Sequence, residues 1–434
     1  MKKTLFLVWA LLGMQWAAAA LPIEHWQSPQ GAQIYLMPSA QLPIVDIRID
    51  WDAGSRRDAQ GKTGTASALA AMLDKGVSAQ NQQPALDENA LADAWADLAA
   101  QTSASADDDR FSVSLRSLSK PDILQPAIAL LARQMGSPNL PAAVWQREQA
   151  KSIAALAEAH TRPPFVAQTT YSHAVYGGHP YGQTPSAASL KAISAADLRQ
   201  FQQRYLSACQ ARISMVGALS RAQAEAIAQQ LLGSLPQTCP TLPPVAKVVN
   251  SQAKTERITM PAAQAQVLLG QIAIARDDPD FFAFLVGNHI LGGGGFASLL
   301  MQKVREDNGL VYGISSDFAP QRDRGAFTIA FQTRPEQAAH ATQLSLQVLG
   351  DFVKNGPTDT ALQAAKANLI GSFPSRLDSN AKLLGMLANI AWNDLPLDYL
   401  DTWTDKIAAV QAADVRRAFA RIQPDALVQV EVAP

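Results

Sequence analysis

The side chains that most often carry protein chemistry are sparse in this chain and form no recognisable catalytic motif. The six histidines are His25, His160, His173, His179, His289 and His340. No two of them are four residues apart, the spacing that would place two zinc ligands on one face of a helix. The serines do not occur in the Gly-x-Ser-x-Gly motif of hydrolases. These residues alone therefore predict neither a metal centre nor a serine nucleophile.

The two cysteines, Cys209 and Cys239, would be able to form one disulfide in an oxidising compartment. The sequence leaves two alternatives open, a bonded pair and two buried thiols, because it does not give the separation of the two Cα atoms. Neither cysteine lies in a setting that is typical of a catalytic nucleophile.

Two runs of identical residues have possible roles that the sequence can separate only in part. The glycine run at 292–295 follows a predicted helix rather than a strand, so it does not match the dinucleotide-binding fingerprint. Such a run provides a hinge or a close approach between backbones. The acidic run at 107–109 precedes a predicted strand, and we expect a solvated loop there, with weak calcium binding as the alternative.

The elements that must position these residues are short strands interleaved with long helices. Clustered or alternating β-forming residues predict strands at 44–51, 110–115, 212–216, 266–274 and 326–333. Periodic segments rich in alanine and leucine predict helices at 65–73, 88–96, 123–135, 144–159, 281–290 and 338–354. Several neighbouring strands are joined by short connections. We therefore predict an α+β fold with mixed or antiparallel sheets packed with helices, and not a doubly wound parallel sheet.

A weak internal repeat indicates two related halves. Residues 191–217 and 406–432 each read as a short helix followed by a strand, with Asp197 and Asp414 at the expected N-caps. Residues 147–156 likewise resemble residues 362–371. The stretch 236–250 contains four prolines and predicts an extended linker. We therefore predict a duplicated α+β unit, with one half at 21–235 and the other at 251–434.

Composition and the first residues bear on class and location. Of the 434 residues 48% are hydrophobic and 17% charged, which excludes a disordered chain, and the net charge of −1 gives no electrostatic case for binding nucleic acid. Lys2 and Lys3, an apolar run at 5–16 and small residues at 18–20 predict a signal peptide over 1–20, cleaved before Leu21. We expect a periplasmic protein that does not insert in the membrane; an uncleaved anchor is the alternative.

The segment 298–318, SLLMQKVREDNGLVYGISSDF, resembles the C-terminal half of the pitrilysin-type zinc metallopeptidases. This is the inverzincin family that includes the mitochondrial processing peptidase. The resemblance rests on Arg305 and Tyr312, seven residues apart around an Asn-Gly turn. Residues 61–76, 179–182 and 193–205 match further family segments, so the resemblance covers essentially the whole mature chain. It implies two homologous half-domains in a clamshell arrangement.

The same resemblance implies that the family's zinc site is lost from this chain. The two histidine ligands would fall at Ser67 and Ala71, the catalytic glutamate at Ala70, and the third ligand near Ala155. Zinc requires nitrogen, sulfur or carboxylate ligands, and activating water requires a base nearby. We therefore expect no metal and no other cofactor in this chain, although its alanines still favour the helix.

The resemblance also implies a role for Arg305 and Tyr312. In the family this pair reaches a zinc site in another half-domain, where it contacts the substrate backbone and the developing oxyanion. Some members pair a zinc-bearing subunit with a zinc-free one. We therefore expect a non-catalytic, zinc-free subunit of a periplasmic heteromeric zinc endopeptidase, acting on a peptide or unfolded polypeptide. The structural alternative is that Arg305 forms a surface ion pair and Tyr312 packs within a strand.

Two other functions stay open at this point. The chain would be a non-enzymatic peptide-binding or scaffold protein if it never associates with a zinc-bearing relative. It would be an active zinc metalloendopeptidase if other residues supplied ligands, an interpretation that we rank last.

Overall fold

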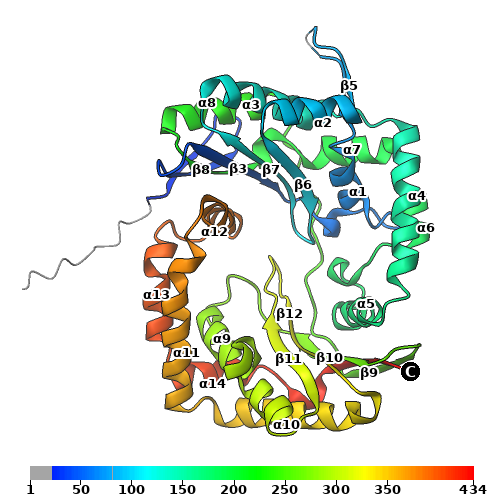
Figure 1. Cartoon of the computed structure of the whole chain (residues 1–434), viewed down its shortest axis with the longest axis vertical. Coiled ribbons are helices and arrows are strands. Elements are labelled where there is room, and N and C mark those ends of the chain that lie inside the picture. Colours follow the sequence, from blue (N-terminus) through cyan, green and yellow to red (C-terminus); the bar gives the residue numbers. More distant parts are fainter. Residues whose placement is uncertain (1–21, 81) are drawn as a thin grey trace, which may run out of the picture.

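The computed structural model describes residues 22–80 and 82–434, and the predicted signal peptide lies outside them. Within these ranges the strands form a six-stranded sheet, a five-stranded sheet and a two-stranded ribbon. The first sheet comes from the first half of the chain and the second sheet from the second half, and helices pack on both (Figure 1). The predicted α+β class with two half-domains is therefore confirmed. Over the same ranges the structure contains no helix with the length and apolarity needed to cross a lipid bilayer.

The first half builds its sheet in the order β1-β2-β8-β3-β7-β6. The β2–β8 pair is parallel and the other neighbours are antiparallel. The strands are β1 (Glu24–Gln27), β2 (Gln33–Pro38), β3 (Ile44–Trp51), β6 (Gln101–Ala106), β7 (Phe111–Leu118) and β8 (Arg212–Gly217), and the ribbon pairs β4 (Gly76–Val77) with β5 (Leu86–Asp87). The helices are α1 (Thr65–Met72), α2 (Glu88–Asp97), α3 (Pro121–Gly136), α4 (Ala142–Ala159), α5 (Pro163–Tyr176), α6 (Ala187–Ala192), α7 (Ala195–Tyr205) and α8 (Arg221–Gly233).

The second half repeats this plan. Its sheet order, β9-β13-β10-β12-β11, follows the same path as β2-β8-β3-β7-β6, and β9 pairs with β13 in parallel at the equivalent place. The strands are β9 (Lys254–Thr259), β10 (Ala265–Ile272), β11 (Val311–Phe318), β12 (Ala326–Thr333) and β13 (Val428–Ala433). The helices are α9 (Phe281–Asn288), α10 (Ala338–Asn355), α11 (Asp359–Ser372), α12 (Asn380–Trp392), α13 (Tyr399–Ala409) and α14 (Ala412–Phe419). Equal strand order in both halves is what a duplicated unit requires.

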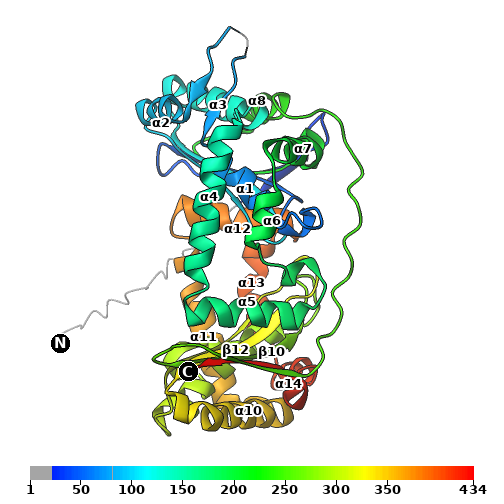
Figure 2. The ribbon, with the colours of Figure 1, turned by 90° about the vertical axis from the view of Figure 1, so that its right-hand side faces the viewer.

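The segment that joins the halves has no regular structure. Residues 236–253 form neither helix nor strand, and the predicted linker at 236–250 lies within them. Figure 2 shows this segment running along one side of the molecule from the first half to the second. Its prolines fix φ and remove backbone donors, so an extended path is the expected result.

The repeated helices α7 and α14 begin with capping boxes. In α7 the hydroxyl of Ser194 accepts from the N–H of Asp197 at 3.2 Å, and the Asp197 carboxylate accepts from the N–H of Ser194 at 2.8 Å. Gln411 and Asp414 form the equivalent box in α14. The prediction that Asp197 and Asp414 are N-caps is therefore wrong by three residues, because each aspartate closes its box from the third helical position.

The two halves are joined by a reciprocal exchange of equivalent helices. Helix α5 of the first half packs on β10 and β13 of the second sheet, and helix α12 of the second half packs on β8, β3 and β2 of the first sheet. Figure 1 shows both helices between the two sheets. The Tyr171 hydroxyl of α5 donates to the carbonyl of Phe327 at 3.0 Å, and Arg212 of β8 binds Asp394, just after α12, at 2.5 Å.

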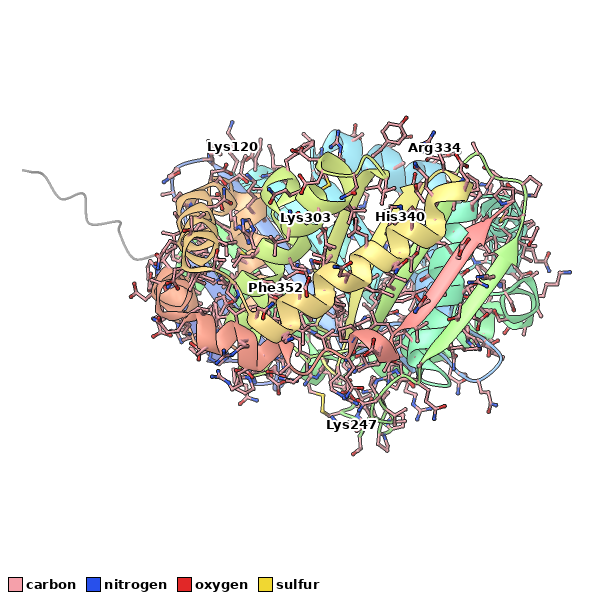
Figure 3. The ribbon with its side chains drawn as sticks, turned by 90° about the horizontal axis from the view of Figure 1, so that it is seen from below. Lys120, Lys247, Lys303, Arg334, His340 and Phe352 are labelled. Carbon is pink, nitrogen blue, oxygen red and sulfur yellow. A yellow bond between two sulfur atoms is a disulfide. The ribbon has the colours of Figure 1, made fainter. Side chains whose placement is uncertain are left out.

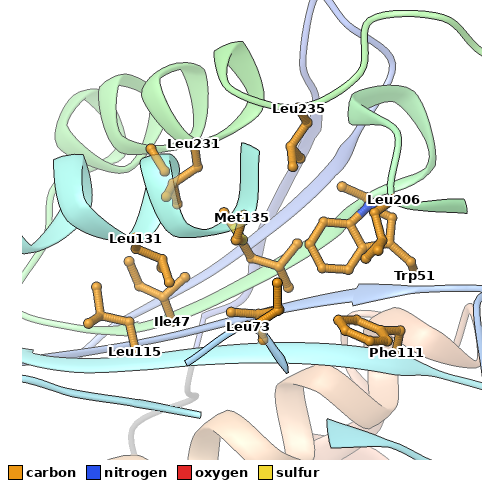
Figure 4. Close-up of a cluster of buried hydrophobic side chains, with 14 of the residues drawn as sticks. Ile47, Trp51, Leu73, Phe111, Leu115, Leu131, Met135, Leu206, Leu231 and Leu235 are labelled. Carbon is orange, nitrogen blue, oxygen red and sulfur yellow. The ribbon is translucent and has the colours of Figure 1, made fainter. Parts of the chain in front are cut away.

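This exchange buries part of the second face of each sheet. In β2, Ile34 and Leu36 belong to the core of the first half, whereas the alternating residues Tyr35 and Met37 belong to a cluster that includes Leu387 of α12. Figure 4 shows the core on the other face, where helices of the first half cover Ile47, Trp51, Phe111 and Leu115. Because β2 is covered on both faces, its sequence is a near-continuous apolar run.

The acidic run at 107–109 lies at a contact between the halves. The Asp109 side chain is buried and pairs with Arg56 at 3.0 Å. It also accepts from the Tyr181 hydroxyl at 2.6 Å and from the backbone N–H of Arg322 at 2.9 Å. The expectation of a solvated loop is therefore wrong, because the partners of this carboxylate come from segments that are distant in the sequence.

The exchanged helix α12 gives a direct test of this packing. Leu387 is fully buried, so Leu387→Ala should lower the free energy of unfolding by about 2–5 kcal/mol through lost contacts and a residual cavity. Leu397→Ala is the matched control, since Leu397 is 42% exposed, and its effect should stay within about 0.5 kcal/mol. Urea unfolding followed by circular dichroism measures both, and equal effects would contradict the packing of α12 between the sheets.

Candidate functional site

Arg305 and Tyr312 stand on either side of one tight turn in the second half. Arg305 lies in the wide helical turn Met301–Glu306, and Tyr312 lies in β11. Gly309 between them has φ of +63°, a left-handed conformation that favours glycine. Its N–H donates to the carbonyl of Arg305 at 2.8 Å, and the Asn308 side chain donates to another carbonyl of the helical turn at 2.8 Å. These bonds close the turn, and the N–H of Ile314 in β11 donates to the Met301 sulfur at 3.4 Å, which holds the helical turn against the strand.

The Tyr312 side chain is exposed, whereas the Arg305 side chain is half-buried. Tyr312 is 78% exposed, and the Arg305 guanidinium lies 4.7 Å from the ring centre of Phe296, which is itself 67% exposed. A cation over an aromatic face is stabilised while the N–H donors at its edge stay available. Within residues 22–80 and 82–434, no carboxylate lies within 4.0 Å of this guanidinium. The geometry therefore suits ligand binding better than a surface ion pair.

A groove of about 820 Å³ follows β11 beside this pair. It is lined along the strand from Tyr312 to Asp317, with glycines of the run 292–295 and Phe296 beside the strand as well. The first turns of α5 contribute from the other half.

β11 is the edge strand of its sheet, but the chain's own residues cover this edge. The Ile314 N–H donates to the Met301 sulfur at 3.4 Å, and the Ser316 carbonyl accepts from the Asn288 side chain at 3.0 Å. An extended peptide in the groove would therefore contact the residues that line it and would not extend the sheet.

The glycine run shapes the groove by close packing. A Cβ atom at Gly292 would lie 2.5 Å from both the backbone nitrogen and the hydroxyl oxygen of Ser316 in β11. Only glycine therefore allows the loop to approach the strand at this point. Of the two interpretations of this run, close backbone approach is confirmed at Gly292.

The positions of the lost zinc motif lie on two helices of the first half. Ser67, Ala70 and Ala71 are in α1 and Ala155 is in α4. Ser67 and Ala71 are exposed and one helical turn apart, whereas Ala70 packs in the core with 9% exposure. In the described part of the chain, no three His, Cys, Asp or Glu side chains gather where they would hold a metal ion. Hydroxyl and methyl groups at these positions do not fit zinc.

Comparison with known proteins places this geometry in a family. Residues 192–369 match the family model described as the peptidase M16 inactive domain. A solved structure with the same description, from Pseudomonas fluorescens, is 34% identical, with a TM-score of 0.89 and coverage of 95% of this chain and 98% of that chain. The chain belongs to the peptidase M16 family. The resemblance to pitrilysin-type zinc peptidases is therefore confirmed.

Curated M16 relatives carry names of two kinds. A Helicobacter pylori protein named non-peptidase homolog YmxG is 24% identical over 425 residues, which cover 96% of this chain and 94% of that protein. A Streptomyces coelicolor protein named an uncharacterized zinc protease is 26% identical over 256 residues, or 57% of this chain and 55% of that protein. The alignment thus spans about half the length of this second relative.

The M16 chain keeps the helix of the zinc motif although it lacks the motif itself. The Asp58 carboxylate accepts from the backbone N–H of Gly64 at 2.6 Å and of Ala66 at 2.9 Å, and so satisfies donors at the start of α1. Burial raises the pKa of Asp58 to about 6, and the N–H groups that it accepts from oppose the shift. The position of α1 therefore depends on its cap and its packing, and not on a metal.

Two parts of the groove were not predicted from the sequence. Phe296 was not identified as the ring under Arg305, although an aromatic residue directly after a glycine run was a visible signal. Pro164 and Gln168 of α5 line the groove only because α5 crosses to the other half. No local sequence pattern predicts that α5 contacts the other half of the chain.

The two cysteines form a disulfide, with Cα atoms 5.9 Å apart and a sequence separation of 30. Cys209 lies just before β8, and Cys239 lies in the segment that joins the halves. The bond therefore attaches the start of this segment to the first half.

The zinc content of the purified chain tests the interpretation that the family's zinc motif is lost. We expect the purified chain to retain no zinc after gel filtration, because Ser67 and Ala71 supply no ligand. The triple variant Ser67→His, Ala71→His and Ala155→Glu restores ligands at the three positions of the family's zinc site and should retain zinc, whereas Ser67→His alone should not. Elemental analysis by mass spectrometry measures the zinc content. Stoichiometric zinc in the unaltered chain would contradict the interpretation.

Proposed function

We propose that this chain is the zinc-free subunit of a periplasmic heteromeric zinc endopeptidase. In this proposal it presents Arg305 and Tyr312 to the zinc site of an M16 partner. The observation that carries the proposal is an exposed tyrosine beside a half-buried arginine without a carboxylate partner among the residues that the structure describes, held by a tight turn, in a chain with Ser67, Ala70 and Ala71 at the zinc positions. Such a chain keeps groups that act on a substrate and lacks those that would bind the metal.

Each of the two side chains has a distinct task in the proposed complex. Arg305 donates from its planar guanidinium to a carbonyl oxygen of the substrate backbone. The Tyr312 hydroxyl donates to the oxyanion that develops when water attacks the scissile carbonyl. Tyr312 is exposed and can enter a site on another subunit, and the half-buried Arg305 stands beside it on the same turn. The groove along β11 holds an extended part of the same substrate.

The names of two relatives are consistent with a zinc-free subunit that acts together with a catalytic partner. The Helicobacter pylori protein, which aligns over nearly the whole chain, is named a non-peptidase homolog, which fits a subunit without its own catalytic site. The Streptomyces coelicolor protein is named a zinc protease, which fits the reaction class of a catalytic partner.

A second candidate function is peptide binding without a catalytic partner. The groove of about 820 Å³ favours it, because the groove is complete within one chain. Copurification with a zinc-bearing M16 chain from the same genome separates the two functions, since only the first requires a stable complex.

Variants of the pair test the role in catalysis. In a complex with the zinc-bearing partner, Tyr312→Phe should lower kcat for peptide cleavage by about 100- to 1000-fold, the usual cost of losing an oxyanion donor. Arg305→Ala should lower kcat/KM because a contact to the substrate backbone is lost. The zinc content of the complex should stay unchanged in both variants.

Arg334→Ala is the matched control, because Arg334 is an exposed arginine of the same half, labelled in Figure 3. It should leave turnover unchanged. If Tyr312→Phe and Arg305→Ala also leave turnover unchanged in an intact complex, the proposed role is wrong.

The periplasmic location is supported by the N-terminal pattern at 1–20 and by the disulfide between Cys209 and Cys239. N-terminal sequencing of protein from the periplasmic fraction should begin at Leu21. Ala20→Lys should block processing, because the cleavage site requires small residues, and the precursor should accumulate. An unprocessed chain in the cytoplasmic fraction would contradict this location.

A further inference from the structure

We infer that the second half contains a separate binding pocket for a carboxylate, at the end of β11 opposite Tyr312. The occupant is an acidic side chain or the C-terminal carboxylate of an extended peptide bound along β11. This inference rests on the proposed peptide-binding role of the groove and adds a determinant of substrate choice.

The pocket has a volume of about 330 Å³, the size of a single large side chain or terminal residue. Its walls come from α9, the end of β11, α12, α13 and the short turn Phe373–Arg376. Aromatic rings form much of its lining, namely Phe281, Phe284, Phe318, Tyr399 and Trp403. A mostly apolar pocket with a few convergent polar groups is the usual form of a ligand site.

Two arginines supply the polar groups, and aromatic rings hold them. The Arg276 guanidinium lies 3.8 Å from the ring centre of Phe281 and donates to the Tyr399 hydroxyl at 2.6 Å. The Arg376 guanidinium lies 5.6 Å from the ring centre of Trp403. Stacked arginines keep a defined position, and their remaining N–H groups can form a charge-assisted bond with a carboxylate.

Positive charge at the pocket is in excess. Arg276 and Arg376 line it, and Lys406 lies 5.4 Å from the ring centre of Tyr399. In residues 22–80 and 82–434, no carboxylate lies within 4.0 Å of any of these three cations. The Asp317 side chain is the acidic group in the lining. The pocket and its border therefore contain three cationic side chains and one carboxylate.

Neighbouring groups do not reduce this excess. Asp278 and Asp280, which follow Arg276 in the sequence, pair instead with Arg421 at 2.7 Å and Arg417 at 2.8 Å. Burial raises the pKa of Tyr399, although the charges of Arg276 and Arg376 oppose the shift, so its hydroxyl stays neutral and able to donate. An anionic ligand would therefore meet an electrostatically complementary site.

The position of the pocket fits an extended chain. Asp317 lines both the groove and the pocket, so the two lie next to each other at the end of β11. From Tyr312 to Asp317 the strand spans about 17 Å at roughly 3.3 Å per residue. An extended peptide that lies in the groove parallel to β11 would therefore place a group in the pocket about five residues from the one beside Tyr312.

Peptide binding to the isolated full-length chain tests the inference by fluorescence polarisation. The probes are ten-residue amidated peptides in which one glutamate is moved along the sequence, each compared with its glutamine counterpart. We expect about tenfold tighter binding for glutamate at one position, because a hydrogen bond to a charged group is gained. A glutamine peptide with a free C-terminus, compared with its amidated form, reports on a terminal carboxylate.

Arg276→Gln and Arg376→Gln should each remove this preference, whereas Arg334→Gln should retain it. Arg376 is exposed, so its variant should fold normally even if Arg276→Gln loses stability with the Tyr399 bond. Circular dichroism of each variant checks this. Equal affinities for every carboxylate and amide pair, or no measurable binding of any peptide, would overturn the inference.

The same measurement on Arg305→Ala separates the inference from the proposed function. This variant should keep the carboxylate preference in the isolated chain while it lowers cleavage in the complex with the partner. A preserved preference with unchanged cleavage would refute the catalytic role alone. A lost preference in Arg376→Gln but not in Arg305→Ala would support the pocket whatever the partner assay shows.

Discussion

The exchange of α5 and α12 between the halves is the constraint on which the rest of the structure depends. The helices of each half cover one face of its own sheet, and the other face of the first sheet carries both an apolar patch at β2 and polar residues such as Asp46 and Asp50 of β3. The other face of the first sheet is covered by Leu387 and its neighbours in α12, and that of the second sheet by Tyr171 and its neighbours in α5. Separation of the halves would expose both faces to water, so the duplicated units fold as one body. The same crossing brings α5 to the wall of the groove along β11, and the functional surface is therefore a product of both halves.

Local patterns predicted the elements whose environment is simple, and missed those whose environment is not. The strands at 44–51 and 326–333 match β3 and β12 in the structure, because β-branched and aromatic residues mark a buried strand by themselves. Neither α5 nor α12 was among the predicted helices. Helix α5 begins with Pro163 and Pro164 and has no clear apolar stripe, and α12 is apolar on several sides because it lies between two packed surfaces. A helix that packs on a distant half of the chain carries no local signal of its partner.

The candidate site, too, could be predicted from local sequence patterns only in part. Arg305 and Tyr312 were found through a family resemblance, since no periodicity distinguishes a ligand-binding arginine from a surface one. Their fixed relation depends on contacts that spacing alone does not give, namely the left-handed Gly309 and the ring of Phe296. Asp109 is the converse case, in which an apparently solvated run proved to be buried. Its charge is balanced by Arg56 and by donors from the second half, and only the folded arrangement places them there.

The loss of zinc chemistry and the retention of the fold follow from where the changed residues lie. Ser67 and Ala71 face outward from α1, so side chains at these positions contribute little to the core, and Asp58 caps the helix whether or not a metal is bound. By contrast, the turn that carries Arg305 and Tyr312 is bonded to β11, and β11 leads on to the arginines of the carboxylate pocket. The metal site is therefore separable from the scaffold, whereas the proposed substrate contacts along β11 depend on the packing of the second half. In the proposed role, a duplicated protein of this kind loses catalysis in one half and binds substrate with the other.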